Sequence, residues 1–263
     1  GALDPYEKPV LPQLDERRLS KIAVLDIGSN SVRLVVFDGA ARSPSYFYNE
    51  KLLCRLGEGL STTGHLNTEG KKRAIAAITR FKFLTESMGI SEVTAVATAA
   101  VRKAKDGLEF CQQVFEQTGQ KIWVINGSEE AQLSAQGVLL GWPGSYGLVC
   151  DLGGSSMELA EINHGMVGRR VTSDLGPLKL QELEGGAAAR QAYIRKTLRR
   201  LASDMGPQHN RLFLVGGSWR ALARVDMQRT DYPLRVLHEY RMGRSSVAKT
   251  LAFLEEVGLE ALQ

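Results

Sequence analysis

Hydrophobic and polar residues alternate in two separate runs along the chain, and each run predicts three successive strands. The predicted strands cover residues 21–27, 32–38 and 45–54 in the first run and residues 147–152, 156–162 and 166–173 in the second. Further strands are predicted at 93–100, 121–126 and 212–217. Three strands followed by alternating helices and strands, twice over, favour two related α/β domains.

Helical spacing of apolar residues, together with helix start signals, predicts helices between the later strands. Asn67 or Thr68 caps the first helix, and Asp106 with Glu109 forms a capping-box pattern at the start of the second. Ser128 is placed to cap the third helix. The other helical patterns cover residues 177–205, a stretch from Ser218 onward and the ending AFLEEVGLEALQ.

The two runs share a detail beyond the strand pattern. Laying Asp26 over Asp151 aligns the strand, the acid, the apolar residue after it, a glycine and a serine. The same hairpin therefore occurs twice, 125 residues apart. We predict one domain over 21–128 and a second over 129–263, after a flexible tail or expression remnant over 1–20.

Composition agrees with two ordinary domains. The chain has 263 residues, of which 43% are hydrophobic and 24% charged, enough for real cores. No apolar run approaches the roughly eighteen residues of a membrane span, and the N-terminus lacks the pattern of a signal peptide. Three widely spaced cysteines favour a reducing compartment, so we expect a cytoplasmic protein.

The net charge of +4 mildly favours anionic partners without choosing among phosphates, nucleic acid and a membrane surface. Basic stretches at 71–73 and 195–200 lie on predicted helices, where solvated faces are the simpler interpretation and a polyanion track the alternative. The four histidines show no metal-ligand spacing.

Both hairpin turns, GSNS at 28–31 and GGSS at 153–156, have the composition of an anion-binding turn. Glycine lets backbone N–H groups approach a phosphate, and serine or asparagine side chains add donors. The flanking acids would repel a bare phosphate, so they indicate a cation such as Mg²⁺. A third turn, GGS at 216–218, joins a strand to a helix N-terminus. One such hairpin alone is more often only a hairpin, but three favour a phosphate cleft between domains.

Seven segments resemble, in order, the successive motifs of the exopolyphosphatase and guanosine pentaphosphate phosphohydrolase family. They are DIGSNSVRL, RLGEGL, ATAAVRKA, NGSEEAQL, DLGGSSMEL, SDLGPLKL and LVGGSWRAL, between about residue 21 and residue 240. The resemblance implies two ribonuclease-H-like domains of the actin-like and sugar-kinase-like type, with an interdomain cleft. This α/β fold agrees with the duplicated strand pattern.

The resemblance also implies a role for each site residue. Glu130 matches the family's catalytic glutamate, although from the residues alone the helix dipole is the better explanation for Glu129 and Glu130. Asp151 and Glu158 match acids that hold Mg²⁺, with Asp26 as a further ligand through water. The implied phosphate-binding residues are Gly28, Ser29, Asn30, Ser31, Arg102, Gly153, Gly154, Ser155, Gly216, Gly217 and Ser218.

Some features depart from the family pattern or stay ambiguous. Ser155 stands where the family usually has a third glycine, and Asn126 stands where serine is common. Many relatives continue into a helical third domain that this sequence does not contain. Two properties that the family resemblance implies, binding of long polyphosphate and formation of a homodimer, therefore stay open. Arg33 is a weaker phosphate-binding candidate, because strand alternation can equally direct it to solvent.

The activity implied is a magnesium-dependent release of terminal phosphate from inorganic polyphosphate, from guanosine pentaphosphate, or from both. The sequence does not choose between these substrates, because both present the same terminal anhydride. A kinase of the same fold superfamily is one alternative, and a non-catalytic sensor of guanosine tetraphosphate or pentaphosphate is another. Specific nucleic-acid binding has the least support, because no recognised module is present.

Overall fold

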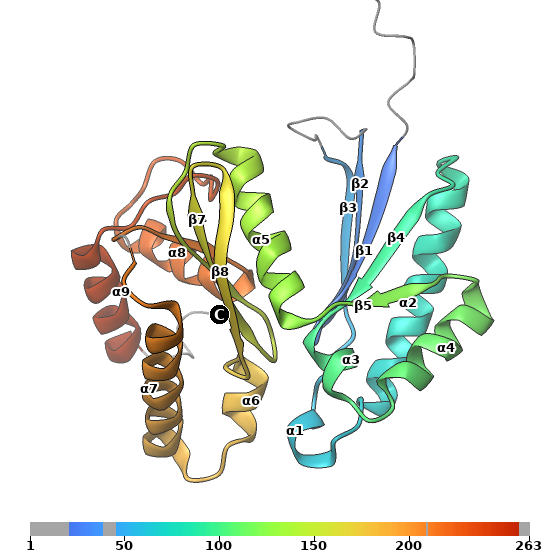
Figure 1. Cartoon of the computed structure of the whole chain (residues 1–263), viewed down its shortest axis with the longest axis horizontal. Helices are drawn as coiled ribbons and strands as arrows, with labels where there is room; N and C mark the ends of the chain where they lie inside the picture. The colour runs from blue at the N-terminus through green and yellow to red at the C-terminus, as the bar shows by residue number, and fades with distance from the viewer. Residues whose placement is uncertain (1–20, 39–45, 209, 258–263) are drawn as a thin grey trace, which may run out of the picture.

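The computed structural model describes residues 21–38, 46–208 and 210–257, which form two α/β halves side by side (Figure 1). Each half is built around its own sheet. The predicted tail over 1–20, the last six residues of the ending pattern, His209 and the first residue of the predicted strand at 45–54 lie outside the described residues.

The first sheet has five strands in the order β3-β2-β1-β4-β5. They are β1 (Ile22–Ile27), β2 (Ser31–Phe37), β3 (Tyr46–Leu53), β4 (Val93–Ala97) and β5 (Ile122–Val124). β1 pairs antiparallel with β2 and parallel with β4. Every second residue of β1 is buried, as the period-two alternation predicts.

The second sheet repeats the first through four strands, in the order β8-β7-β6-β9. They are β6 (Gly147–Leu152), β7 (Met157–Asn163), β8 (Met166–Ser173) and β9 (Leu212–Val215). β6 pairs antiparallel with β7 and parallel with β9, as β1 does with β2 and β4. The duplication inferred from the strand pattern is therefore confirmed.

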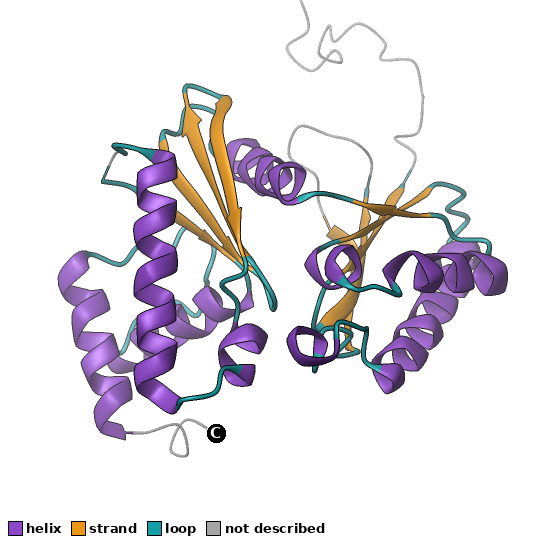
Figure 2. Ribbon diagram, turned by 60° about the horizontal axis from the view of Figure 1, so that its bottom comes forward, coloured by secondary structure: helices purple, strands orange, loops and turns teal. Residues whose placement is uncertain are grey.

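Helices cover both sheets. The first half contains α1 (Leu60–Thr63), α2 (Thr68–Ser87), α3 (Ala99–Lys103) and α4 (Gly107–Thr118), and the second contains α6 (Pro177–Glu182), α7 (Gly186–Met205), α8 (Gly217–Arg229) and α9 (Arg244–Val257). Helix α5 (Gly127–Gly141) lies between the two sheets and packs against β6, β7 and β8 (Figure 2). One apolar cluster fills the first half, and two others lie on opposite faces of the second sheet.

The helix caps differ in part from the sequence predictions. Asn67 caps α2 as expected, because its side chain accepts a hydrogen bond from Gly70 N at 2.8 Å. The predicted capping box at Asp106 is wrong, since the Asp106 carboxylate instead accepts from Leu66 N and Lys71 Nζ. The Ser128 cap is also wrong, because Asn126 caps α5.

Several element limits also differ from the predictions. The strand expected at 93–100 ends at Ala97, and α3 begins two residues later. The motif RLGEGL at 55–60 leads into the single turn of α1, and the helical pattern at 177–205 is two helices. Positive φ angles at Gly185 and Gly186, of 94° and 68°, separate α6 from α7 where a continuous helix cannot pass.

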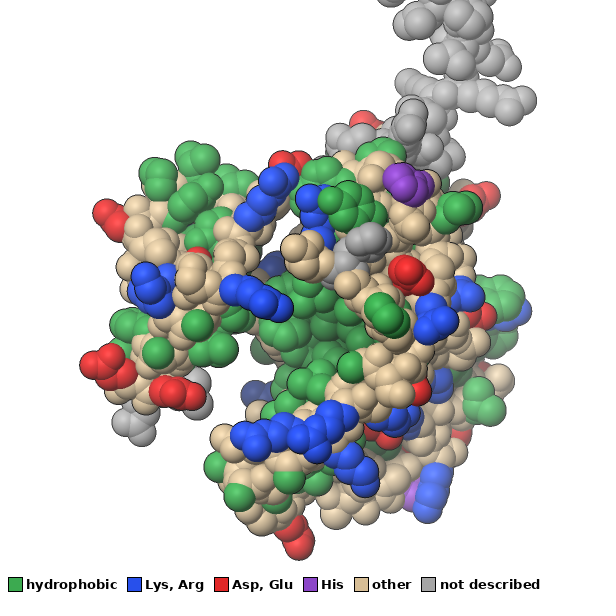
Figure 3. Space-filling model, turned by 60° about the vertical axis from the view of Figure 1, so that its left-hand side comes forward, with side chains coloured by type: hydrophobic (Ala, Val, Ile, Leu, Met, Phe, Trp, Pro, Cys, Tyr) green, Lys and Arg blue, Asp and Glu red, His purple; other side chains and the backbone are tan. Residues whose placement is uncertain are grey.

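The two basic stretches behave differently. Residues 71–73 are not simply a solvated face, because Lys71 pairs with Asp106 and Arg73 donates to Cys54 O. In the stretch 195–200, Arg195, Lys196 and Arg199 are exposed on α7, as a solvated face predicts. Figure 3 shows this side of the molecule, with Lys and Arg side chains in a row beside a hollow that has an apolar floor.

The described part of the chain contains no helix with the length and hydrophobicity needed to cross a bilayer. Its three cysteines are free thiols, and Cys54 and Cys150 are buried. Burial raises the pKa of the Cys150 thiol to about 12, which suits a structural core residue.

Candidate active site

A cleft of about 1000 Å³ lies between the two halves. The β1–β2 turn lines it from the first half, and the β6–β7 turn and the start of α8 line it from the second. All three turns expected to bind phosphate therefore face one space. The expected site residues that line it are Asp26, Gly28, Ser29, Asn30, Ser31, Glu130, Asp151, Gly153, Gly154, Gly216, Gly217 and Ser218.

The two hairpin turns have the same backbone geometry. Gly28 N donates to Ser31 O at 2.9 Å, and Gly153 N donates to Ser156 O at 3.0 Å. Each turn therefore closes on itself through the same pair of positions, 125 residues apart. Concave turns of this kind direct backbone N–H groups toward an anion.

The acids at the ends of β1 and β6 have different cross-strand neighbours. Asp26 lies opposite Arg33, whereas Asp151 lies opposite Glu158. Residues directly opposite one another in an antiparallel pair project from the same face. In the first hairpin a carboxylate therefore lies opposite a guanidinium group, and in the second hairpin two carboxylates lie opposite one another.

The third turn requires glycine at its first position. Gly216 has a φ of 116°, and a Cβ added there would lie 2.5 Å from Leu152 O. Helix α8 begins at the next residue, so its first N–H groups, which have no partner within the helix, lie at the cleft beside Ser218.

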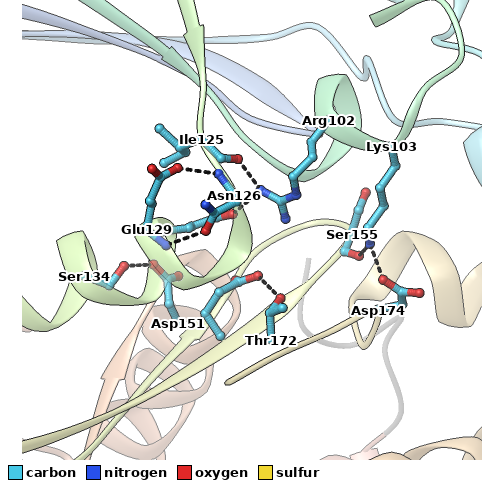
Figure 4. A network of polar contacts seen from close by, with 12 residues as sticks. Arg102, Lys103, Ile125, Asn126, Glu129, Ser134, Asp151, Ser155, Thr172 and Asp174 are labelled. Carbon is cyan, nitrogen blue, oxygen red and sulfur yellow. Dashed lines mark hydrogen bonds and ion pairs between the residues drawn. The ribbon is translucent and has the colours of Figure 1, made fainter. Parts of the chain in front are cut away.

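Helix α5 brings Glu130 to the cleft. Asn126 Oδ1 accepts from Glu129 N at 2.9 Å, and the Glu129 carboxylate accepts from Asn126 N at 2.7 Å, which forms a complete capping box (Figure 4). The Glu129 carboxylate is therefore engaged in the helix cap. Glu130 projects about 100° further round the helix and lines the cleft.

Arg102 lies beside Glu130, whereas the sequence resemblance implied a contact with phosphate. Its Nη1 donates to Ile125 O at 2.7 Å and to Glu130 Oε2 at 3.1 Å (Figure 4). Arg102 is not among the described residues that line the cleft. The contact fixes the position of the Glu130 carboxylate and favours its charged form.

Four carboxylates crowd this region. Burial is the main cause that raises the pKa of Asp26, Glu130, Asp151 and Glu158. Mutual repulsion adds to this, since Asp151 raises the pKa of Asp26, and Glu130 raises that of Glu158. The pKa of Glu158 reaches about 8, and Arg102 opposes the rise at Glu130.

Glu158 is the most enclosed of the four acids, with 1% of its surface exposed. Its Oε1 accepts from Thr172 Oγ1 at 2.9 Å, but its buried Oε2 has no hydrogen-bond partner among the described residues. A buried acid with an unsatisfied oxygen is costly unless another group compensates it. Positive charge supplied with a ligand would do so.

The residues present fit a magnesium ion held jointly with phosphate. Within the described ranges, no group of three or more His, Cys, Asp or Glu side chains is arranged to hold a metal by itself. Mg²⁺ commonly takes only one or two carboxylates, together with waters and substrate phosphates. Asp151 lines the cleft and suits such a shared site, whereas Glu158 lies directly opposite it on β7 and is not among the residues that line the cleft.

Ser155, the departure from the family's third glycine, lies outside the main cleft. Its carbonyl accepts from Lys103 Nζ at 3.0 Å, and the residue lines a second, smaller cavity. Ser156 lines the main cleft instead. The additional side chain at 155 therefore lies on the side of the smaller cavity, near Gly57, and does not line the main cleft.

Three basic residues of the cleft were not among the sequence candidates. Lys51, Arg55 and Arg220 line it together with Arg33. The β2–β3 register places Lys51 opposite Arg33, so strand alternation could have indicated it. Arg220 lies in the first turn of α8, where helical spacing after the glycine turn gave a weaker signal.

Fold and site together define a two-domain α/β protein whose cleft has the composition expected of a site for phosphate groups. A model of the Ppx/GppA phosphatase family matches residues 35–260, which is most of the chain. The chain belongs to the Ppx/GppA phosphatase family.

Curated relatives carry the name exopolyphosphatase. The chain is 33% identical over 175 residues to Exopolyphosphatase 2 of Mycobacterium tuberculosis, covering 62% of this chain and 54% of that protein. It is 32% identical over 143 residues to Exopolyphosphatase 1 of the same organism, covering 53% of this chain and 42% of that protein. The chain thus spans about half the length of the curated relatives it matches.

Solved structures agree on the fold. An exopolyphosphatase from Cytophaga hutchinsonii matches with a TM-score of 0.79 and 21% identity, covering 93% of this chain and 84% of that one. The Aquifex aeolicus member of the Ppx/GppA family matches with a TM-score of 0.71 and 24% identity, covering 92% and 80%. The predicted fold, two actin-like, ribonuclease-H-like domains with a cleft between them, is confirmed.

Proposed function

We propose that this protein is a magnesium-dependent phosphohydrolase that releases terminal phosphate from inorganic polyphosphate, from guanosine pentaphosphate, or from both. One observation carries the proposal: two equivalent phosphate-type turns and a helix N-terminus meet in one cleft with the partly buried glutamate Glu130. Membership of the family and the names of its curated relatives support the polyphosphate substrate.

Glu130 is the proposed general base. Water attacks the terminal phosphorus, a proton of that water passes to the Glu130 carboxylate, and the P–O bond to the bridging oxygen breaks. The electron pair of that bond stays on the shortened chain as a new terminal phosphate. The Arg102 contact holds the carboxylate in place, and enclosure brings its pKa upward, closer to the range where it accepts a proton efficiently.

The turns and the basic residues stabilise the charge that develops during transfer. Backbone N–H groups of the turn residues Ser29, Asn30 and Gly154, together with those at the start of α8, surround the reacting phosphate. The basic residues Arg33, Lys51, Arg55 and Arg220 neutralise the rest of the phosphate chain. Asp151 and Glu158 would hold Mg²⁺, with Asp26 acting through water. The ion would supply positive charge to the phosphate oxygens.

The cellular setting belongs to the same proposal. The three free thiols support a cytoplasmic location. Polyphosphate or guanosine pentaphosphate is the proposed ligand, and a homodimer remains a prediction from the family resemblance.

The test is phosphate release with Mg²⁺ from long polyphosphate and from guanosine pentaphosphate, measured side by side. Glu130→Gln should lower kcat by about 10²- to 10⁴-fold while polyphosphate binding is retained. Glu129→Gln is the matched control, because Glu129 serves the helix cap, and it should release phosphate at nearly the wild-type rate.

The outcomes separate the alternatives. An active Glu130→Gln variant would remove Glu130 from the reaction. No release from either substrate by wild-type protein that still binds guanosine tetraphosphate would favour a sensor. The ratio of the two wild-type rates names the substrate.

A further inference from the structure

The phosphate turns of the two halves meet at the loop between β3 and α1. Gly57 N donates to Ser29 O at 2.8 Å. A Cβ added to Gly57 would lie 3.0 Å from Ser155 Oγ and 3.1 Å from Ser29 Cβ, so this glycine lies between both turns. A Cβ added to Gly154 would likewise lie 3.1 Å from Ser29 Cβ. The distance between the turns therefore depends on how this loop is held.

Glu182, at the end of α6 in the second half, binds the start of α1 in the first half, where that loop ends. Its Oε1 accepts from Gly59 N and its Oε2 from Ser61 N, each at 3.0 Å, and Ser61 Oγ donates to it as well. These residues are 121 to 123 positions apart in the sequence. A carboxylate that accepts several N–H and O–H bonds makes a strong, charge-assisted contact.

Lys103 makes the reciprocal contact from the first half to the second. From the end of α3, its Nζ donates to Ser155 O at 3.0 Å and pairs with Asp174 Oδ1 at 2.6 Å (Figure 4). Ser155 is part of the second phosphate turn, and Asp174 precedes α6. The two contacts thus cross the boundary between the halves in opposite directions.

Both contacts border one small cavity. It measures about 190 Å³ and is lined by Gly57, Ser61, Lys103, Ser155, Asp174 and Glu182, among others. The contacts therefore act at one end of the junction, next to the phosphate turns. Neither Glu182 nor Lys103 lines the main cleft.

We infer that Glu182 and Lys103 are positioning residues, which hold the two halves together so that the phosphate turns of both halves face one phosphate group. The expected loss of reaction rate in variants of these residues rests on the proposed function, whereas the expected change in the distance between the two halves does not. Glu182 contributes more than Lys103, because the Asp174 carboxylate is 66% exposed and its ion pair is weakened by water and salt.

The geometric test measures the distance across the cleft with spin labels. Cysteines replace Thr79 on α2 and Ser203 on α7, both exposed, in a Cys111→Ser background, since Cys54 and Cys150 are buried. Glu182→Ala should broaden the distance distribution and shift it to longer values. Glu184→Ala is the matched control two residues away, because the exposed Glu184 side chain makes no polar contact with the described residues, and it should leave the distribution unchanged.

The kinetic test compares kcat and KM for polyphosphate. Glu182→Ala should lower kcat by about tenfold or more, because misalignment of the reacting groups mainly costs the transition state. Glu182→Gln keeps an amide oxygen that accepts one N–H, so it should recover part of the rate. Lys103→Met should give a smaller loss, with Lys105→Met as its control.

Wild-type distances in Glu182→Ala, or a rate loss equal in the alanine and glutamine variants, would overturn the inference. If Glu182→Ala does not fold, the distances between the spin labels are measured in Glu182→Gln and Lys103→Met instead. Wild-type distances in both of these variants would overturn the inference. If wild-type protein releases no phosphate, the proposed function fails, and the distance measurement still tests the positioning role.

Discussion

Arg102 has a contact that suggests a second role for its side chain. The resemblance implied that its guanidinium binds phosphate, but it donates to Glu130 Oε2 at 3.1 Å and to Ile125 O. Arg102→Met should therefore lower kcat by about tenfold to a hundredfold and leave KM nearly unchanged, because the carboxylate loses its fixed position. Steady-state kinetics with polyphosphate measure both constants.

A phosphate-binding role would give a different result. Loss of a direct contact with the bound substrate would raise KM, and Arg102→Lys, which keeps the charge, would restore it. If Arg102→Met mainly raises KM, the positioning role is wrong and the role implied by the resemblance is right.

At the scale of elements, a buried carboxylate joins α8 to α9. Asp226 on α8 accepts from Thr250 Oγ1 at 2.6 Å and from Ser246 Oγ at 2.8 Å on α9. It also accepts from Arg229 at 2.7 Å and from Tyr240 Oη at 2.6 Å. Burial by itself raises the pKa of Asp226, but these four donors together hold it well below its ordinary value of 3.8.

This arrangement predicts how stability depends on pH. Because the folded pKa lies below the unfolded one, the stabilisation is fully present above about pH 4 and is lost as the pH falls toward the folded pKa. Asp226→Asn should therefore cost roughly 2–3 kcal/mol at pH 7 and less at pH 3. Thermal unfolding at pH 7, 5, 4 and 3 measures the difference in Tm.

Asp204→Asn on α7 is the control, because the Asp204 side chain is exposed and only its backbone carbonyl accepts a hydrogen bond. A Tm difference between wild type and Asp226→Asn that stays constant from pH 7 to pH 3 would contradict the assignment. The third phosphate turn lies at the start of α8. Loss of the Asp226 contacts between α8 and α9 at neutral pH should therefore weaken phosphate binding as well.

At the scale of the whole molecule, the cleft combines carboxylates from both halves with basic residues from both halves. Polyphosphate alone meets repulsion from these acids, and Mg²⁺ alone lacks the phosphate oxygens it prefers as ligands. The two together should therefore raise Tm by more than the sum of their separate effects. At 100 times the dissociation constant, bound ligand contributes about 2.7 kcal/mol.

Differential scanning fluorimetry with Mg²⁺, with polyphosphate, with both and with both plus EDTA tests this prediction. Glu130→Gln should show the same combined shift, because that residue acts on water in the proposed reaction. A full shift with polyphosphate in EDTA would exclude a role for the metal in binding.

The sequence by itself determined the duplicated α/β architecture and the family. Period-two alternation, glycine-serine turns and helix caps act between residues close in sequence, so the hairpins at 21–38 and 147–163 could be predicted within one or two residues. Asp26, Asp151 and the glycines of the cleft could be predicted as well, because each lies in or beside a turn whose own residues shape it. Glu130 lies on α5 and was indicated only by the family resemblance.

Only the tertiary structure decided which side chains meet. Glu129 was separated from Glu130 by a cap at Asn126, and Arg102 was placed beside Glu130. Glu182 reaches a loop 121 residues away, which no local pattern indicates. Such partners depend on how two separately folded sheets pack against one another, and that packing results from burial of surfaces that are scattered along the whole chain.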